Sequence, residues 1–124
     1  MPKVSKESAT NVVKEGPVED HNEDVDGYTV NFTSFQADID ATPLLQGLPG
    51  GNCSCPHWGY VVSGQVTYRF ADHEETFEAG DAFYVAPGHI PIVVAGTEIL
   101  QFSPAEELRP VSEALVAATR AMMS

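Results

Sequence analysis

The chain has 124 residues, of which 43% are hydrophobic and 9% aromatic, and its 18 acidic and 6 basic residues give a formal net charge of −12. This length suits one domain that buries about two thirds of its unfolded surface. A surface this acidic repels phosphate backbones and anionic lipid, so the composition argues against binding to nucleic acid or to a membrane surface.

The first segment, residues 1–26, is polar and acidic, and it predicts a solvated arm that is flexible or docked on a partner. Its last part, Glu19 to Asp26, is the most acidic stretch, and His21 within it is expected to be exposed. The arm has no apolar core of secretory length, and no run in the chain approaches a membrane span. Cys53 and Cys55 lie too close in sequence for an unstrained disulfide. We therefore expect a reducing, cytoplasmic location.

From Gly27 onward, short alternating segments separated by turns predict β-strands. Tyr28 to Phe35 is the first of them, and a helical turn at 40–45 and a loop at 48–52 follow it. A turn at Gly64 is expected to join the next two strands into an antiparallel hairpin. The remaining strands are expected at 57–63, 65–70, 75–78, 82–85, 92–94 and 98–102.

The end of the chain predicts helix. Ser103 to Glu106 has a capping-box pattern with proline at the first helical position, and Pro110 is expected to end this turn and begin a second helix. Apolar residues at helical spacing predict that the second helix packs on the domain or on another copy of it. These residues are Val111, Leu115, Ala118 and Met122.

The order of these elements predicts the fold class. Many short strands followed by a terminal helix are typical of an all-β sandwich or barrel. We expect the acidic arm over 1–26, the β-barrel over 27–103 and the helical segment over 104–124.

Ligand-type side chains gather in the segment that begins at Cys53. Cys55 and His57 are two residues apart, so they share one face if the segment is a strand. His89 lies in a proline-rich turn after a later strand. Thiolate and imidazole suit zinc or iron better than magnesium or calcium. The spacing predicts one metal ion held by Cys55, His57 and His89, with Cys53 or water as fourth ligand, because Cys53 and His57 would be too far apart in an extended strand.

A plainer interpretation competes with the metal site. A buried cysteine often packs as a small hydrophobic residue, and a buried histidine is often only hydrogen-bonded. In that case the barrel holds an organic ligand or nothing. Arg69 is the one fixed cation between the N-terminal lysines and Arg109, so it is the candidate side chain for binding an organic anion. Alternatively, Arg69 pairs with Asp72 or Glu78 on a sheet face.

The aromatic residues and the last histidine carry weaker expectations. Four aromatic residues are expected in the core and on a dimer face rather than as stacking partners of a substrate: Trp58, Tyr60, Phe83 and Tyr84. Exposed strand edges in a small sandwich also predict a homodimer. His73 is expected to be a simple turn residue.

Two glycine-anchored motifs resemble those of the cupin superfamily. Gly80 to His89 resembles its second motif, and His57 to Gly64 resembles the end of its first. The match covers about residues 50–103, and it implies a jelly-roll β-barrel. The Cys-Pro-His-Trp-Gly-Tyr-Val run and the Pro-Gly-His-Ile-Pro run also resemble a group of small single-domain bacterial cupins whose members mostly lack an assigned activity.

The usual cupin ligand positions carry other residues here. The position of the glutamate ligand is His57, the usual histidine pair falls near Gly51 and Cys53, and the second-motif histidine falls at Pro91 with His89 two residues earlier. Ligand-type residues therefore stand close to each expected position.

Two functions remain open from the sequence. The first is a small metalloenzyme that uses the barrel mouth for dioxygenation, isomerisation or hydrolysis of a small molecule. The second is a non-catalytic module that binds or senses a small ligand, with or without a metal. Fold alone does not choose between them.

Overall fold

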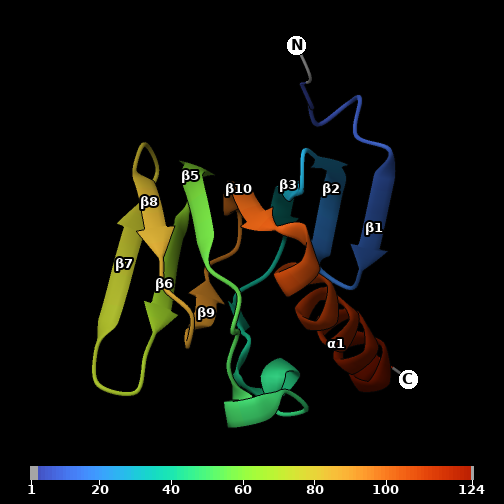
Figure 1. The fold of residues 1–124 in the computed structure, drawn as a ribbon. Helices are drawn as coiled ribbons and strands as arrows, with labels where there is room; N and C mark the ends of the chain where they lie inside the picture. Colours follow the sequence, from blue (N-terminus) through green and yellow to red (C-terminus); the bar gives the residue numbers. More distant parts are fainter. Residues whose placement is uncertain (1–2, 124) are drawn as a thin grey trace.

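The structure is a computed structural model that describes residues 3–123, and it shows two antiparallel β-sheets followed by a helix (Figure 1). The order of the six-stranded sheet is β1 (Asn11–Glu15), β2 (Val18–Val25), β3 (Tyr28–Phe35), β10 (Glu98–Pro104), β5 (His57–Ser63) and β8 (Ala82–Val85). The order of the four-stranded sheet is β4 (Ile39–Asp40), β9 (Ile90–Val93), β6 (Gln65–Arg69) and β7 (Glu74–Glu78).

Short helical turns and one long helix complete the chain. Two 3-10 helices, η1 (Thr42–Leu45) and η2 (Pro49–Gly51), lie between β4 and β5, and α1 (Ala105–Met123) follows β10. The predicted all-β sandwich with a C-terminal helix is confirmed. Among residues 3–123, no helix combines the length and apolar character that a membrane crossing needs.

The core between the sheets is built from side chains that alternate along the strands. Its fully or nearly buried members are Val61, Val66, Tyr68, Phe83, Val85, Val93 and Ile99. A second apolar cluster lies where α1 meets η1, and it includes Leu45, Leu108 and Val111. The first cluster holds β5 and β6 against the facing sheet, and the second holds α1 against η1.

The hairpin between β5 and β6 turns at Gly64, which adopts a φ of 79°. A side chain is disfavoured at this position for two reasons. The left-handed conformation is strained for residues other than glycine, and an added Cβ would lie 2.3 Å from Oγ1 of Thr97. The predicted hairpin is present, and the glycine allows Thr97 to pack directly on the turn.

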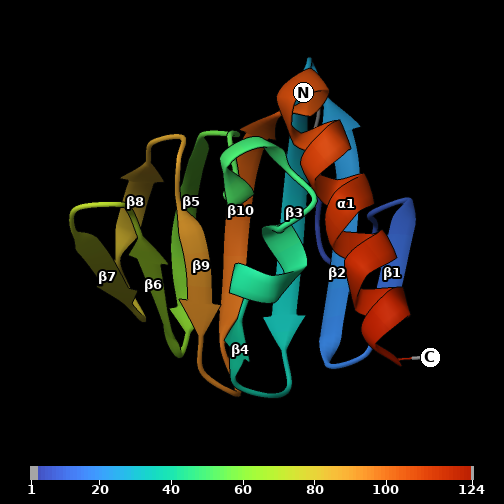
Figure 2. The ribbon, with the colours of Figure 1, turned by 90° about the horizontal axis from the view of Figure 1, so that it is seen from below.

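The six-stranded sheet is wider than the sheet it faces, and α1 covers the surplus. Figure 2 shows α1 crossing in front of β1 and β2, at the end of the sheet that the other sheet does not reach. The helix therefore replaces strands that a symmetric sandwich would place there. This arrangement leaves a cavity between α1 and the inner face of β1, β2 and β3.

Residues 11–25 differ from the expected flexible arm. They form the β1–β2 hairpin, and β2 pairs with β3 along its whole length, from Val18 opposite Phe35 to Val25 opposite Tyr28. The hairpin buries little apolar surface because its inner face is polar, so composition suggested a solvated arm. His21 is also less exposed than expected, because its ring packs on the sheet with Nε2 2.7 Å from Oε2 of Glu19.

The helix also differs from expectation, because α1 runs without interruption through Pro110. A proline inside a helix removes one backbone hydrogen bond. Buried side chains on both sides of it, Leu108 and Val111, pack in the same apolar cluster. That shared packing keeps the two parts of the helix continuous.

Candidate metal centre

A short pairing outside the main sheets brings the ligand-type residues together. The backbone N–H of Cys53 donates to the carbonyl of His89 at 2.8 Å, and the N–H of Gly88 donates back to the carbonyl of Cys53 at 2.8 Å. His57 begins β5 with its side chain turned inward. The loop before β5 and the turn before β9 are therefore held side by side.

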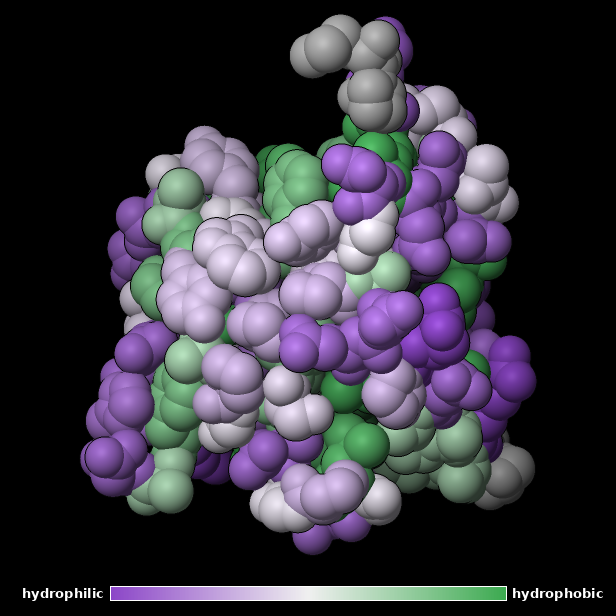
Figure 3. All heavy atoms as spheres, in the orientation of Figure 1, coloured by the Kyte–Doolittle hydropathy of each residue, from purple (hydrophilic) through white to green (hydrophobic). Residues whose placement is uncertain are grey.

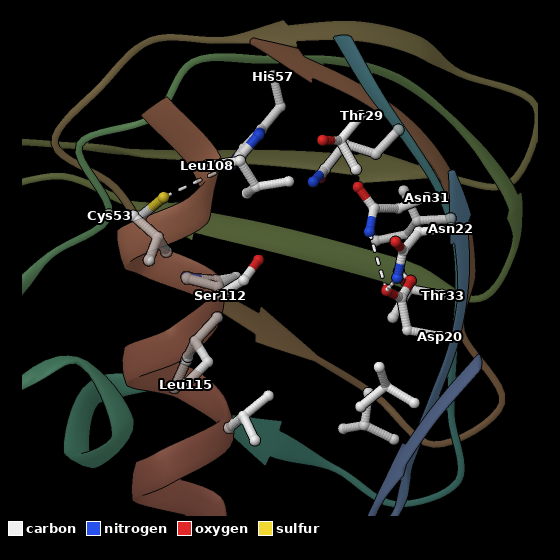
Figure 4. Close-up of a pocket in the computed structure, with 18 of the residues that line it drawn as sticks. Asp20, Asn22, Thr29, Asn31, Thr33, Cys53, His57, Leu108, Ser112 and Leu115 are labelled. Atoms are coloured by element: carbon white, nitrogen blue, oxygen red, sulfur yellow. Dashed lines mark hydrogen bonds between the residues drawn. The ribbon is translucent and has the colours of Figure 1, made fainter. Parts of the chain in front are cut away.

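Three buried side chains converge at this point. One ligand atom each from Cys53, His57 and His89 lies within 4.8 Å of the other two, and their residues are 4%, 5% and 1% exposed. The Sγ atom of Cys53 lies 3.5 Å from Nε2 of His57 (Figure 4). A thiol and two imidazoles at these distances can share one ion.

The proton on His89 is placed by its neighbour. Nδ1 lies 2.7 Å from the carbonyl oxygen of Ala86. A carbonyl only accepts, so Nδ1 carries the hydrogen and Nε2 keeps its lone pair. That Nε2 atom is buried and has no hydrogen-bond partner among the described residues. A buried lone pair without a partner is costly, and a metal ion would satisfy it.

His57 is held by Ser103 on β10. Nδ1 of His57 lies 2.7 Å from Oγ of Ser103, whose residue is fully buried. In the tautomer whose Nδ1 donates to Ser103, the lone pair of Nε2 faces Sγ of Cys53. A histidine that binds a metal usually donates its other ring N–H to such a fixed partner.

Burial sets the protonation of the three groups. Desolvation, helped by the nearby His89, lowers the pKa of His57 to about 3, and desolvation also lowers the pKa of His89. Desolvation raises the pKa of the Cys53 thiol to about 11. Near neutral pH the two imidazoles are therefore neutral and ready to coordinate, while the thiol must lose a proton to become a good ligand.

Cys55 lies outside this cluster, although the strand-face argument placed it in the first trio. Its Sγ atom is 3.4 Å from the carbonyl of Pro56, and its residue packs in the apolar cluster with Leu108 and Val111. Burial, together with Cys53 and Glu107, raises the pKa of its thiol to about 12. Because β5 begins only at His57, residues 53–56 lie outside the strand and its two-residue alternation does not apply to them. Cys53 therefore meets His57 four residues on, and Cys55 between them does not.

Arg69 and His73 lie on the surface. The Nε atom of Arg69 donates to Oε2 of Glu74 at 3.0 Å, and its Nη1 lies 4.0 Å from Oδ2 of Asp40. Arg69 does not line the cavity, so it does not occupy the position expected of an anion-binding residue. His73 is an exposed turn residue, as expected, and its ring stacks on Phe70.

The cluster lies on a cavity of about 420 Å³ that extends under α1. One wall of the cavity is apolar and comes mainly from α1, with Leu108, Val111 and Leu115. The opposite wall is polar and comes from β2 and β3 (Figure 4). Its residues are Asp20, Asn22, Asp24, Thr29, Asn31 and Thr33.

Sequence reasoning missed the polar wall. The available signal is in β3, where the polar residues Thr29, Asn31 and Thr33 alternate with Val30 and Phe32. In β2 both faces are polar, so residues 20–24 give no such signal. Tyr68 of β6 also lines the cavity, and its ring meets that of His89 edge-on at a centroid distance of 5.0 Å.

Solved structures identify the fold. No protein-family model matches the chain, and no curated protein matches it. The chain is similar to a protein of unknown function from Rhizobium leguminosarum, at 13% identity over 83% of this chain and 95% of that one, with a TM-score of 0.60. It is also similar to an RmlC-like cupin from Shewanella frigidimarina, at 18% identity, 84% and 92% coverage and a TM-score of 0.55.

A cupin superfamily protein from Desulfitobacterium hafniense gives the same result, at 16% identity, 74% and 81% coverage and a TM-score of 0.54. The chain therefore has the cupin fold, as its two glycine-anchored motifs indicated. At these identities the likeness concerns the fold, and the chemistry has to be argued from this chain's own side chains.

Proposed function

We propose that this protein binds one divalent transition-metal ion, zinc or iron, through Cys53, His57 and His89, and a small molecule in the adjoining cavity. The observation that carries the proposal is the buried lone pair of His89 Nε2, which lacks a hydrogen-bond partner among the described residues. Its residue belongs to a cluster in which one ligand atom each from His89, His57 and Cys53 lie within 4.8 Å of one another. Sulfur and nitrogen ligands favour these metals over magnesium or calcium.

Three protein ligands leave a coordination position for water or substrate, as in catalytic rather than structural zinc sites. A metal bound there would act as a Lewis acid toward a group in the cavity. Cys53, His57 and His89 would hold it, and Ser103 would orient His57. This arrangement supports a metal-dependent enzyme acting on a small molecule. A ligand-binding module without metal is the alternative.

Metal content distinguishes these functions. Full-length protein purified without chelator or affinity tag is analysed for metals and titrated with zinc and with iron(II). We expect one ion per chain, and we expect Cys53→Ala, His57→Ala and His89→Ala to reduce uptake strongly. Cys55→Ala is the matched control because it removes the neighbouring buried thiol outside the cluster, and it should retain the ion. A wild-type chain that takes up neither metal would leave the ligand-binding module as the function.

The outer face of the six-stranded sheet carries exposed aromatic residues. Figure 3 shows pale spheres, the colour of tyrosine and tryptophan, gathered over β5 and β8. Trp58 and Tyr84 are 43% and 49% exposed with ring centroids 5.1 Å apart, and Tyr28 lies edge-on to Trp58. Phe83, in contrast, is a core residue. Tyr60 and Phe102 extend the exposed patch.

We infer that this aromatic patch pairs two copies of the chain into a homodimer. A patch of this kind on a soluble protein usually marks an interaction site. A second copy would bury uncharged rings on both sides despite the net charge of −12. Light scattering should give twice the 13.3 kDa chain mass, and Trp58→Glu should shift it to the monomer. A wild-type monomer at micromolar concentration would contradict this inference.

The two free, buried cysteines suit the proposed cytoplasmic location.

A further inference from the structure

The two walls of the cavity do not match one another. Across the space, α1 presents apolar side chains such as Leu108 and Leu115, whereas β2 and β3 present carboxylates, amides and hydroxyls (Figure 4). Polar groups facing an apolar wall gain nothing from it. A ligand with one polar and one apolar part would satisfy both walls at once.

Asp20 organises the polar wall. Its Oδ2 accepts hydrogen bonds from the side-chain amides of Asn22 and Asn31, at 2.7 and 2.9 Å, and its Oδ1 accepts one from the hydroxyl of Thr33 at 2.7 Å. An ionised carboxylate only accepts, so these bonds fix the orientation of both amides. The network directs its donors at Asp20.

The same network leaves an acceptor without a partner. Because the Nδ2 atom of Asn31 faces Asp20, its Oδ1 atom faces the other way, and Figure 4 shows it turned from Asp20 into the space near Thr29. Asn31 is 8% exposed, and Oδ1 has no hydrogen-bond partner among the described residues. The hydroxyl of Thr29 is already donated to Asp24 at 2.6 Å. A donor supplied by a ligand would satisfy Asn31.

The negative charge of the wall also favours a ligand that is a cation and a hydrogen-bond donor. Within residues 3–123, neither Asp20 nor Asp24 forms an ion pair with a lysine or arginine. Glu15 also lines the cavity, but Arg120 already pairs with it at 2.8 Å. Arg109 is the one cation among the lining residues, and its side chain is exposed on α1. The cavity therefore repels anions and attracts cations that donate hydrogen bonds.

We propose that the cavity binds a small primary amine, with its ammonium group donating to Oδ1 of Asn31 in the field of Asp20 and Asp24, and its apolar body against α1. The ammonium supplies the donor that Asn31 lacks and the positive charge that Asp20 lacks. The cavity volume of about 420 Å³ lies within the range of about 300–1,000 Å³ typical of small-molecule sites. This inference rests on the proposed function in one respect, since it names the chemical class of the ligand that shares the cavity with the metal.

Three probes with the same apolar body test the inference: n-hexylamine, n-hexanol and n-hexanoate. Their binding to full-length protein is measured by titration calorimetry near neutral pH. Hexylamine should bind about tenfold or more tightly than hexanoate, since the two carry opposite charges into the same site. Equal affinities, or tighter binding of hexanoate, would overturn the inference.

Two variants locate the ammonium group. Asp20→Asn should weaken hexylamine binding about tenfold or more and leave hexanol binding nearly unchanged. Glu23→Gln is the matched control, because it removes the same charge from the outer face of the same strand, and it should bind hexylamine as the wild type does. If Asp20→Asn does not fold, Asn31→Leu replaces it, with several-fold weaker hexylamine binding expected. Undiminished binding by the folded variant refutes the inference.

The titrations are repeated on metal-free and zinc-loaded protein, so the two proposals fail separately. Amine binding that depends on Asp20 in protein that takes up no metal supports this inference and refutes the metal proposal. A chain that holds zinc through His89 but does not prefer hexylamine refutes this inference and leaves the metal proposal standing.

Discussion

Lowering the pH should destabilise the metal-free protein through His57. Burial lowers the pKa of this histidine from its ordinary 6.5 to about 3 in the folded chain. The unfolded chain therefore binds one more proton than the folded chain between these two values, so stability is full above pH 6.5 and falls as the pH drops toward 3. Each pH unit in this window costs about 1.4 kcal/mol of unfolding free energy.

From pH 7.5 to pH 4.5 the loss from His57 alone is about 2.5 kcal/mol. The lowered pKa of His89 acts in the same direction. The raised pKa of the exposed His73 acts in the opposite direction. Urea unfolding of chelator-treated protein at several pH values measures the total slope.

The variant His57→Gln isolates the contribution of His57, because glutamine can still hydrogen-bond to Ser103 but does not titrate. Its unfolding free energy should depend less on pH than that of the wild type by about 2.5 kcal/mol over the same interval. Parallel pH profiles for the two proteins would show that His57 titrates normally in the folded state, and the argument from burial would fail.

Two further predictions concern the turn at Gly64 and the thiol of the cluster. Gly64→Ala should lower the unfolding free energy by about 1–3 kcal/mol, because the residue is held at positive φ against Thr97, and chemical denaturation measures the change; a loss below this range would mean that the turn relaxes freely. Zinc binding near pH 7 should release about one proton per ion, because the raised pKa keeps the Cys53 thiol protonated until it coordinates. Calorimetry in buffers of different ionisation enthalpy counts the released protons. If a Cys53→Ala variant still binds zinc and still releases a proton, the proton comes from a group other than the Cys53 thiol.

The sequence predicted the central strands and the terminal helix because each has a recognisable local pattern. Tyr28 to Phe35 alternates, and the hairpin turns at a glycine. Val111 and Leu115 of the helical stripe pack in the apolar cluster, whereas Met122 at its end is 64% exposed. The β1–β2 hairpin was missed because its inner face lines a cavity and therefore carries polar residues. Asp26 and Gly27, both at positive φ in the turn between β2 and β3, form the Asp-Gly pair typical of such hairpins, and they were the available signal.

The residue types of the candidate cluster, one cysteine and two histidines, were predicted from the sequence, but their arrangement in space was not. His57 and His89 meet as expected, but Cys53 joins them rather than Cys55. The alternation rule applies only within a strand, and the strand begins at His57, after Pro56. Sequence spacing could not reveal that Cys53 pairs with His89 across an isolated bridge, because this contact joins segments distant along the chain.

The extra strands of the six-stranded sheet, β1 and β2, have a consequence for how this protein can change in evolution. The polar wall lies in residues 20–33, whereas the Cys/His cluster lies in residues 53–89, and separate stretches of backbone hold the two. Substitutions on the inner face of β2 can therefore change the cavity wall without moving Cys53, His57 or His89. On the proposed function, ligand selectivity and metal binding are then encoded in different parts of the gene, so mutation and selection can act on one while the other stays constant.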